Sequence, residues 1–120
     1  MGKVQKKKFT GIIKEIIEKS LFTERQIEII LKQRHMSDME FNVTRGAYYR
    51  QVQQSQEKLE GLYYSMILLR GLDLIDDEHY KVVTKLGKHI DVILDSDIFN
   101  ERERDVGKMI DEVVQKLSKM

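Results

Sequence analysis

Side chains that often carry chemistry are spread along this 120-residue chain without the spacings that catalysis or metal binding needs. The histidines His35, His79 and His89 stand in separate contexts, and only Asp76 and His79 are one helical turn apart. A metal site built on helices needs a second such pair. The glycines form no phosphate-binding loop, and no serine sits in a nucleophile elbow. We therefore predict a non-enzymatic protein with no catalytic residue, metal, cofactor or small-molecule substrate.

A second group of residues has the chemistry of nucleic-acid contacts. The stretch NVTRGAYYRQVQQSQEKL, residues 42–59, holds two arginines, a tyrosine pair and several glutamines, and no acidic residue occurs between residues 41 and 56. Arginine pairs with guanine, glutamine pairs with adenine, and tyrosine or threonine hydroxyls reach phosphates. The alternative is an ordinary polar helix surface. The missing carboxylates favour a DNA contact.

The same stretch begins a long amphipathic helix, predicted from about residue 45 to residue 70. Thr44 is its expected cap, and Gly71 is its expected left-handed stop. The predicted inward seam repeats at spacings of four and three: Tyr48, Val52, Ser55, Leu59, Leu62, Met66 and Leu69. Off this seam lie Arg45, Tyr49, Gln53 and Gln56, flanked by Arg50, Gln51 and Gln54. Periodicity therefore predicts an outer face without acids.

Further helices flank the long one. Thr10 is a candidate cap for a first helix, whose apolar face holds Ile12, Ile13, Ile16 and Ile17. Thr23 and Gln26 have capping-box spacing before a second helix, and Ser37 and Glu40 repeat that spacing for a short helical turn. A two-stranded wing near EFNVTRG is a weaker alternative, because the seam period is unbroken. Two C-terminal amphipathic helices are predicted from these residues: Tyr80, Val83, Leu86, Ile90, Ile93 and Leu94 in one, and Val106, Met109, Ile110, Val113 and Leu117 in the other.

The segments FTERQIEIILKQ and TRGAYYRQVQQSQEKL, within residues 22–60, resemble the helix-turn-helix of sigma-factor region four and of related small bacterial and archaeal regulators. In that family the start of the last helix enters the major groove. By position, the resemblance implicates Thr44, Arg45, Tyr49, Arg50 and Gln53 in DNA binding. The segment SDMEF is shorter than the family's middle helix, and residues 61–120 lie outside the resemblance.

Composition places the chain among folded proteins, with 41% hydrophobic and 34% charged residues and no cysteine or proline. Residues 1–60 carry 12 basic and 8 acidic residues, whereas residues 61–120 carry 9 and 12. An anionic partner is thus expected on the N-terminal half. Residues 1–9 form an expected flexible basic tail in which Lys6, Lys7 and Lys8 would attract phosphates. No apolar run approaches a membrane span, so we expect a cytoplasmic protein.

These patterns predict an all-α fold: a helix-turn-helix-like N-terminal unit, a long central helix and two C-terminal helices in a dimeric bundle. Residues 10–120 are expected to form a single domain, with a helix-turn-helix-like part over 22–60 and a dimerisation part over 60–120. A homodimer would bury surplus apolar surface and present two reading helices to two half-sites of duplex DNA. The predicted function is sequence-specific DNA binding by a small transcriptional regulator. The alternative is a helical protein-interaction module that uses the Tyr48 to Leu69 seam.

Overall fold

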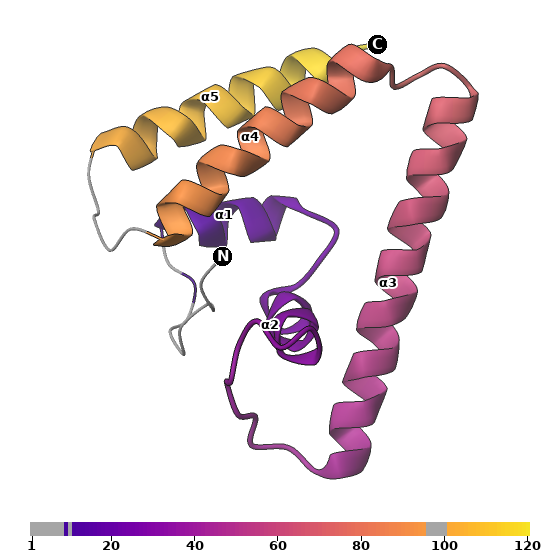
Figure 1. Ribbon diagram of the computed structural model, residues 1–120, viewed down its shortest axis with the longest axis vertical. Coiled ribbons are helices and arrows are strands. Elements are labelled where there is room, and N and C mark those ends of the chain that lie inside the picture. Colours follow the sequence, from indigo (N-terminus) through magenta and orange to yellow (C-terminus); the bar gives the residue numbers. More distant parts are fainter. Residues whose placement is uncertain (1–8, 10, 96–100) are drawn as a thin grey trace. The chain divides into compact units, whose positions relative to one another are not determined.

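The computed structural model describes residues 9, 11–95 and 101–120, and all of its regular elements there are helices. They are α1 (Gly11–Lys19), α2 (Glu24–Gln33), α3 (Arg45–Gly71), α4 (Asp77–Asp95) and α5 (Glu101–Leu117) (Figure 1). The all-α prediction is confirmed, and the described residues contain no strand, so the wing near residue 43 is absent. No helix in this part of the chain is both long and apolar enough to cross a bilayer.

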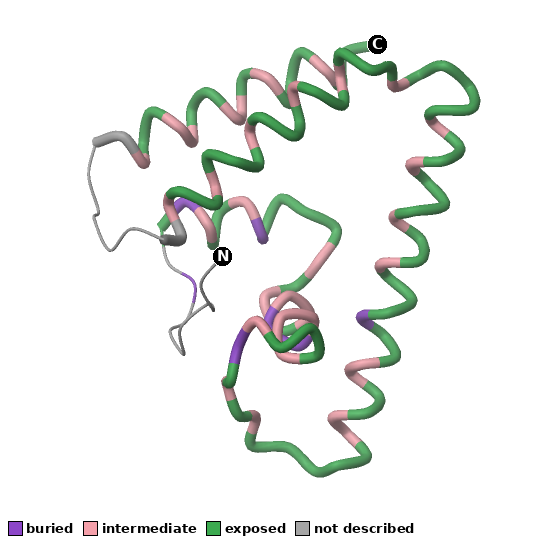
Figure 2. Tube along the Cα trace, in the orientation of Figure 1, coloured by how far each residue is buried: buried purple, intermediate pink, exposed green. Residues whose placement is uncertain are grey.

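The chain divides into two compact units, Met1–Leu68 and Leu69–Met120, and the boundary falls inside α3. In the first unit α1 packs against α2. The predicted apolar face of α1 is confirmed, because Ile12 and Ile17 are buried and the other two isoleucines are half-buried (Figure 2). Phe9, the last residue of the expected tail, is also buried. Cooperative folding of residues 10–120 as one domain stays a prediction.

Helix α2 begins and ends with hydrogen bonds that satisfy its free backbone groups. The Thr23 hydroxyl accepts from the Gln26 N–H at 3.2 Å, and the Gln26 side chain accepts from the Thr23 N–H at 2.9 Å, so the predicted capping box is confirmed. At the other end His35 is left-handed, with φ 58°. The N–H groups of His35 and Met36 donate to Lys32 and Leu31, which closes the helix in a Schellman motif.

Helix α3 is about 40 Å long at 1.5 Å per residue, and its predicted seam is confirmed. Every seam residue from Tyr48 to Leu69 is buried or half-buried, and Ser55 is 1% exposed. The predicted stop at Gly71 is wrong by two residues. The left-handed residue is Asp73, with φ 62°, and the N–H groups of Asp73 and Leu74 donate to Arg70 and Leu69. Gly71 is therefore helical, and an aspartate takes the place that glycine often occupies.

In the second unit α4 packs against α5. The predicted line of α5 (Val106, Ile110, Val113 and Leu117) is half-buried, whereas Met109 is exposed. The predicted face of α4 is partly wrong, because Tyr80 and Val83 are 56% and 57% exposed. The less exposed line of α4 consists of His79, Val82, Leu86, Ile90 and Ile93. The prediction for Leu94 lies outside the described side chains.

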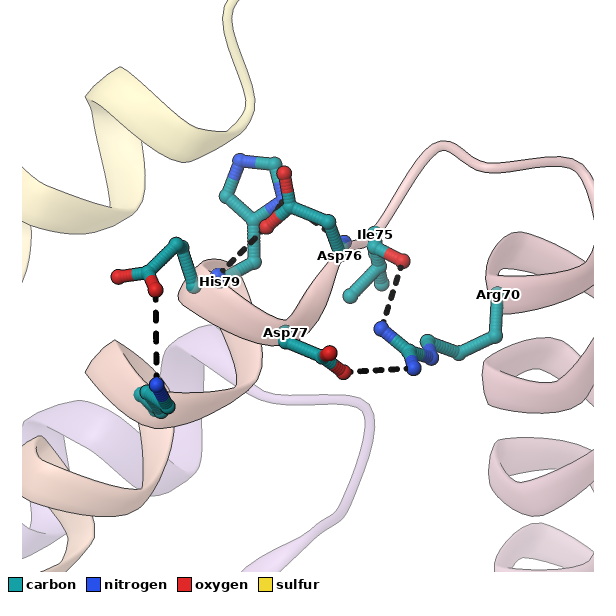
Figure 3. A network of polar contacts seen from close by, with 7 residues as sticks. Arg70, Ile75, Asp76, Asp77 and His79 are labelled. Atoms are coloured by element: carbon teal, nitrogen blue, oxygen red, sulfur yellow. Dashed lines mark hydrogen bonds and ion pairs between the residues drawn. The ribbon is translucent and has the colours of Figure 1, made fainter.

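Asp76 and His79, the pair that had metal-site spacing, cap α4 instead (Figure 3). The His79 N–H donates to Asp76 Oδ1 at 2.9 Å, and the Asp76 N–H donates to His79 Nδ1 at 3.1 Å. Hydrogen bonds from the backbone N–H groups of His79 and Glu78, together with the positive charge of Arg70, lower the pKa of Asp76. Beside this cap, the Arg70 guanidinium donates to Asp77 Oδ1 at 2.8 Å and to the Ile75 carbonyl at 3.3 Å. The α3–α4 turn is thus fixed by polar contacts.

We predict that Thr23→Ala lowers the free energy of unfolding by about 1 kcal/mol, because it leaves the Gln26 N–H without its cap. Urea denaturation followed by circular dichroism measures this change. Thr84→Ala is the matched control, because the Thr84 hydroxyl only donates back to the Tyr80 carbonyl inside α4. The control should change stability by less than about 0.5 kcal/mol. Equal losses in the two variants would contradict the assigned cap.

Candidate nucleic-acid interface

The candidate interface lies on the outer face of the N-terminal half of α3. We call Arg45, Tyr49, Arg50 and Gln53 the contact face. All four side chains are exposed, and Tyr49 is 65% exposed. Since successive helical residues are turned by about 100°, Tyr49 and Gln53 form a central line and the two arginines flank it. The inward seam of α3 fixes this orientation.

Backbone capping positions the first turn of this face. Thr44 was predicted both to cap α3 and to contact DNA, and its hydroxyl accepts from the Ala47 N–H at 3.1 Å. The cap is confirmed, and the Thr44 hydroxyl keeps one proton to donate elsewhere. A Cβ atom added to Gly46 would meet nothing within 4 Å. No close packing inside the described chain therefore explains this glycine.

The contact face has no neighbouring carboxylate over residues 41–56. Neither arginine of the face forms an ion pair with a residue that the structure describes. At its C-terminal edge the Gln53 amide donates to Glu57 Oε1 at 3.4 Å, and the Gln53 carbonyl oxygen remains available as an acceptor. Gln51, predicted on the flank, instead turns inward: its Oε1 is buried without a donor among the described residues. The result is a cationic face that ends at Glu57.

An aromatic and cationic cluster holds the start of α3 against α2. The Phe41 and Tyr48 rings stack at 5.9 Å between centroids. The Arg25 guanidinium lies 4.7 Å from the Phe41 centroid, and Lys32 Nζ lies 5.4 and 5.6 Å from the Phe41 and Tyr48 centroids. We call these four side chains the aromatic cluster. They are within cation–π distance. Lys32 therefore lies beside the Tyr48 ring of α3, whereas Arg25 lies over Phe41 in the connection and also forms an ion pair with Glu28 at 3.5 Å.

Tyr48 adds a polar contact to this cluster. Its hydroxyl donates to Gln33 Oε1 at 2.9 Å, and desolvation by burial raises the pKa of the Tyr48 phenol above its ordinary value. The aromatic cluster was not predicted, because only Tyr48 was assigned a role, as a seam residue. The sequence signal that was available is a phenylalanine seven residues before Tyr48 and basic residues seven apart on α2, at Arg25 and Lys32.

The connection between α2 and α3, residues 34–44, contains no helix. The short helical turn predicted from the Ser37 and Glu40 spacing is therefore wrong. The Ser37 hydroxyl accepts from the Met39 N–H at 3.2 Å, two residues away, so it closes a local turn and caps nothing. Ser37 is itself buried. The α2–α3 pair thus lacks the tight connection of a helix-turn-helix, and the aromatic cluster does the positioning.

The remaining predicted residues belong to other parts of the chain. Lys6, Lys7 and Lys8, and the predicted cap Thr10, lie outside the described residues. Of the histidines, His35 ends α2 and His79 caps α4. Within the described ranges no three His, Cys, Asp or Glu side chains group in a way that would hold a metal ion.

No protein family, curated protein or solved structure matches this chain. The resemblance of residues 22–60 to sigma-factor region four therefore stays a prediction. Support for a function comes from the geometry and the charge of the contact face.

We predict that Tyr48→Phe lowers stability by about 0.5–1.5 kcal/mol, the usual net contribution of one hydrogen bond. The effect should depend on pH. The folded state holds the phenol proton more tightly than the unfolded state, so this stabilisation is complete below pH ~10, the unfolded pKa, and is lost as pH rises through the folded pKa. Urea titrations at pH 8 and at a series of higher pH values measure both effects.

Tyr49→Phe is the matched control, because Tyr49 is the exposed neighbour and its hydroxyl forms no hydrogen bond with a residue that the structure describes. It should follow the wild type at every pH. The assignment fails if Tyr48→Phe and Tyr49→Phe lose stability with the same pH profile.

Proposed function

We propose that this chain is a cytoplasmic, sequence-specific DNA-binding protein, acting as a homodimer in transcription regulation, whose contact face enters a groove of duplex DNA. The observation that carries the proposal is the exposed quartet Arg45, Tyr49, Arg50 and Gln53 on one side of a helix, within a stretch, residues 41–56, that contains no carboxylate. Arginines that already pair with carboxylates of the chain would bind DNA weakly. Arg45 and Arg50 have no ion-pair partner among the described residues.

Each side chain of the face has a suitable partner on DNA. The B-DNA major groove is about 12 Å wide and admits one α-helix. Arg45 and Arg50, on the two flanks, fit the phosphates or a guanine edge, and the free Gln53 carbonyl oxygen fits the exocyclic amine of adenine. The Tyr49 hydroxyl fits a phosphate. Lys6, Lys7 and Lys8 would add attraction that weakens with salt.

The proposed docking mode differs from that of a helix-turn-helix. In that motif a preceding helix crosses the DNA backbone and a short turn sets the reading angle. Here an irregular connection precedes α3, and the aromatic cluster sets the angle between α2 and α3. Lys32, which forms no ion pair with a described residue, would then lie near the phosphates that flank the groove.

A second candidate function is a helical protein-interaction module. The observation that favours it is the exposed apolar surface of Tyr63, Tyr64, Ile67 and Leu68 on α3. The seam from Tyr48 to Leu69, the surface first expected to bind a partner, is half-buried within the chain. An interaction module without a nucleic-acid role would not bind random duplex DNA, whereas a DNA-binding protein binds it weakly and loses affinity steeply as salt rises.

We predict that Arg45→Ala combined with Arg50→Ala weakens binding to a random-sequence duplex until the shifted band is lost in a gel shift, and leaves helicity unchanged. If both arginines contact phosphates, the residual slope of log affinity against log salt falls by about 0.9 for each. Fluorescence anisotropy over a salt series measures the slope.

The matched control removes two positive charges elsewhere. Arg104 and Lys116 are exposed on α5, and their double alanine variant should keep its affinity to within a factor of about three, because only long-range attraction changes. If the Arg45 and Arg50 variant binds as tightly as the wild type, the contact face is not the DNA-binding surface. If both double variants lose binding, the loss is explained by the change in net charge and not by the contact face.

We predict that Gly46→Ala raises the stability of the protein and weakens its binding to DNA. Alanine is favoured over glycine in helices by about 0.8–1.0 kcal/mol, and no atom lies within 4 Å of the added Cβ. The variant should be more stable in urea and yet bind DNA more weakly, because the added methyl group would collide with the sugar–phosphate backbone of the DNA. Gly87→Ala on α4, also in open space, should gain stability and keep its affinity. Unchanged binding by Gly46→Ala would show that DNA does not approach this turn.

A further inference from the structure

Residues 61–69 of α3 form a segment that contains no charged side chain. Its inward line, Leu62, Met66 and Leu69, is half-buried. On the other side Tyr63, Tyr64, Ile67 and Leu68 are 54%, 74%, 68% and 59% exposed. At about 100° per residue these four side chains centre opposite the inward line. The segment is thus apolar on both sides, which in a helix of this kind is typical of burial.

The four exposed side chains, which we call the apolar face, can be dehydrated at little polar cost. The neighbouring Ser65 hydroxyl already donates to the Gly61 carbonyl at 2.8 Å. The tyrosine hydroxyls are at the ends of long side chains and can reach water at the rim of an interface. A partner that covers this face must itself be uncharged over about 13 Å of helix, at 1.5 Å per residue.

We infer that the apolar face binds the same face of a second copy of this chain, with the two α3 helices antiparallel and crossing near Ser65. A second copy meets the requirement for an uncharged partner, because it offers the same nine-residue uncharged segment. It also satisfies the two-fold symmetry of most homodimers, in which one patch pairs with itself.

The charges that flank the segment determine the antiparallel direction. Glu60 lies five residues before Ser65, and Arg70 lies five residues after it. In an antiparallel pair centred on Ser65, Glu60 of each copy is level with Arg70 of the other. In a parallel pair, Glu60 would meet Glu60. Arg70 donates to Asp77 and Ile75, and its guanidinium has further donors for a second carboxylate.

The area agrees with a dimer of modest affinity. At about 100–150 Å² for each partly exposed side chain of this size, the face would bury roughly 500 Å² per copy. The total of about 1,000 Å² is the size at which specific interfaces begin. We therefore expect self-association in the micromolar range.

This inference deepens the homodimer in the proposed function, and its test contains no DNA. Sedimentation velocity of the full chain over a concentration series measures the mass. The wild type should approach twice the 14.2 kDa of one chain. Ile67→Lys should raise the dissociation constant at least tenfold. Val92→Lys is the matched control, because Val92 is 67% exposed on α4, and it should leave the constant within a factor of two.

Three outcomes would overturn the inference: a monomeric wild type, an unaffected Ile67→Lys dimer, or dissociation by Val92→Lys alone. Circular dichroism of each variant confirms that it is folded. If Ile67→Lys is poorly folded, Tyr64→Lys replaces it, because Tyr64 is 74% exposed. Gel shifts on the same variants show separately whether DNA binding is lost, so the failure of either proposal is recognisable.

The direction of pairing has its own measurement. The chain has no cysteine, so Gln56→Cys gives one spin label per copy. Gln56 is nine residues from Ser65, which places the two labelled backbones about 27 Å apart along an antiparallel pair. A parallel pair would hold them at the interhelical distance of about 8–10 Å. A short distance by electron paramagnetic resonance would overturn the antiparallel arrangement.

Discussion

The contact of Tyr48 with Phe41 is the interaction on which the candidate interface depends. Helix α2 and helix α3 are joined by an irregular connection, and backbone hydrogen bonds alone do not fix such a segment. The stacked rings, two nearby cations and the Tyr48–Gln33 hydrogen bond tie the connection to both helices. Individually these are contacts of about 0.5–1.5 kcal/mol, and together they set how the outer face of α3 is presented.

Much of the fold can be predicted from local rules that the sequence displays. The α3 seam was predicted because a residue's side of a helix is set by its number, and the α2 capping box was predicted because its two hydrogen bonds are local. The α1 and α5 faces are predicted in the same way. The exposure of Arg45, Tyr49, Arg50 and Gln53 is a consequence of that periodicity, so the arrangement of the contact face was predictable. Periodicity does not determine what the face binds.

The remaining features depend on contacts between elements or on uncommon backbone states. Val83 is as apolar as Val82, and packing against α5 decides which line of α4 turns inward. Asp73 adopts the left-handed conformation, which glycine adopts at less cost. The nearby Gly71 was therefore predicted as the end of the helix in its place. The aromatic cluster joins α2, a connection and α3, and pairings across such distances leave no periodic signal. The prediction of a helical turn at Ser37 was wrong because a serine hydroxyl that can cap a helix can also close a shorter, non-helical turn.

Helix α3 carries the contact face and the apolar face on one side of one continuous rod, and it therefore keeps both their spacing and their phase. Inserting one residue between them would lengthen the rod by about 1.5 Å and turn one face by about 100° relative to the other. Four inserted residues would nearly restore the phase but add about 6 Å. Residues 57–60 should thus resist changes of length, because an insertion or deletion there alters the spacing and the phase of the two faces together.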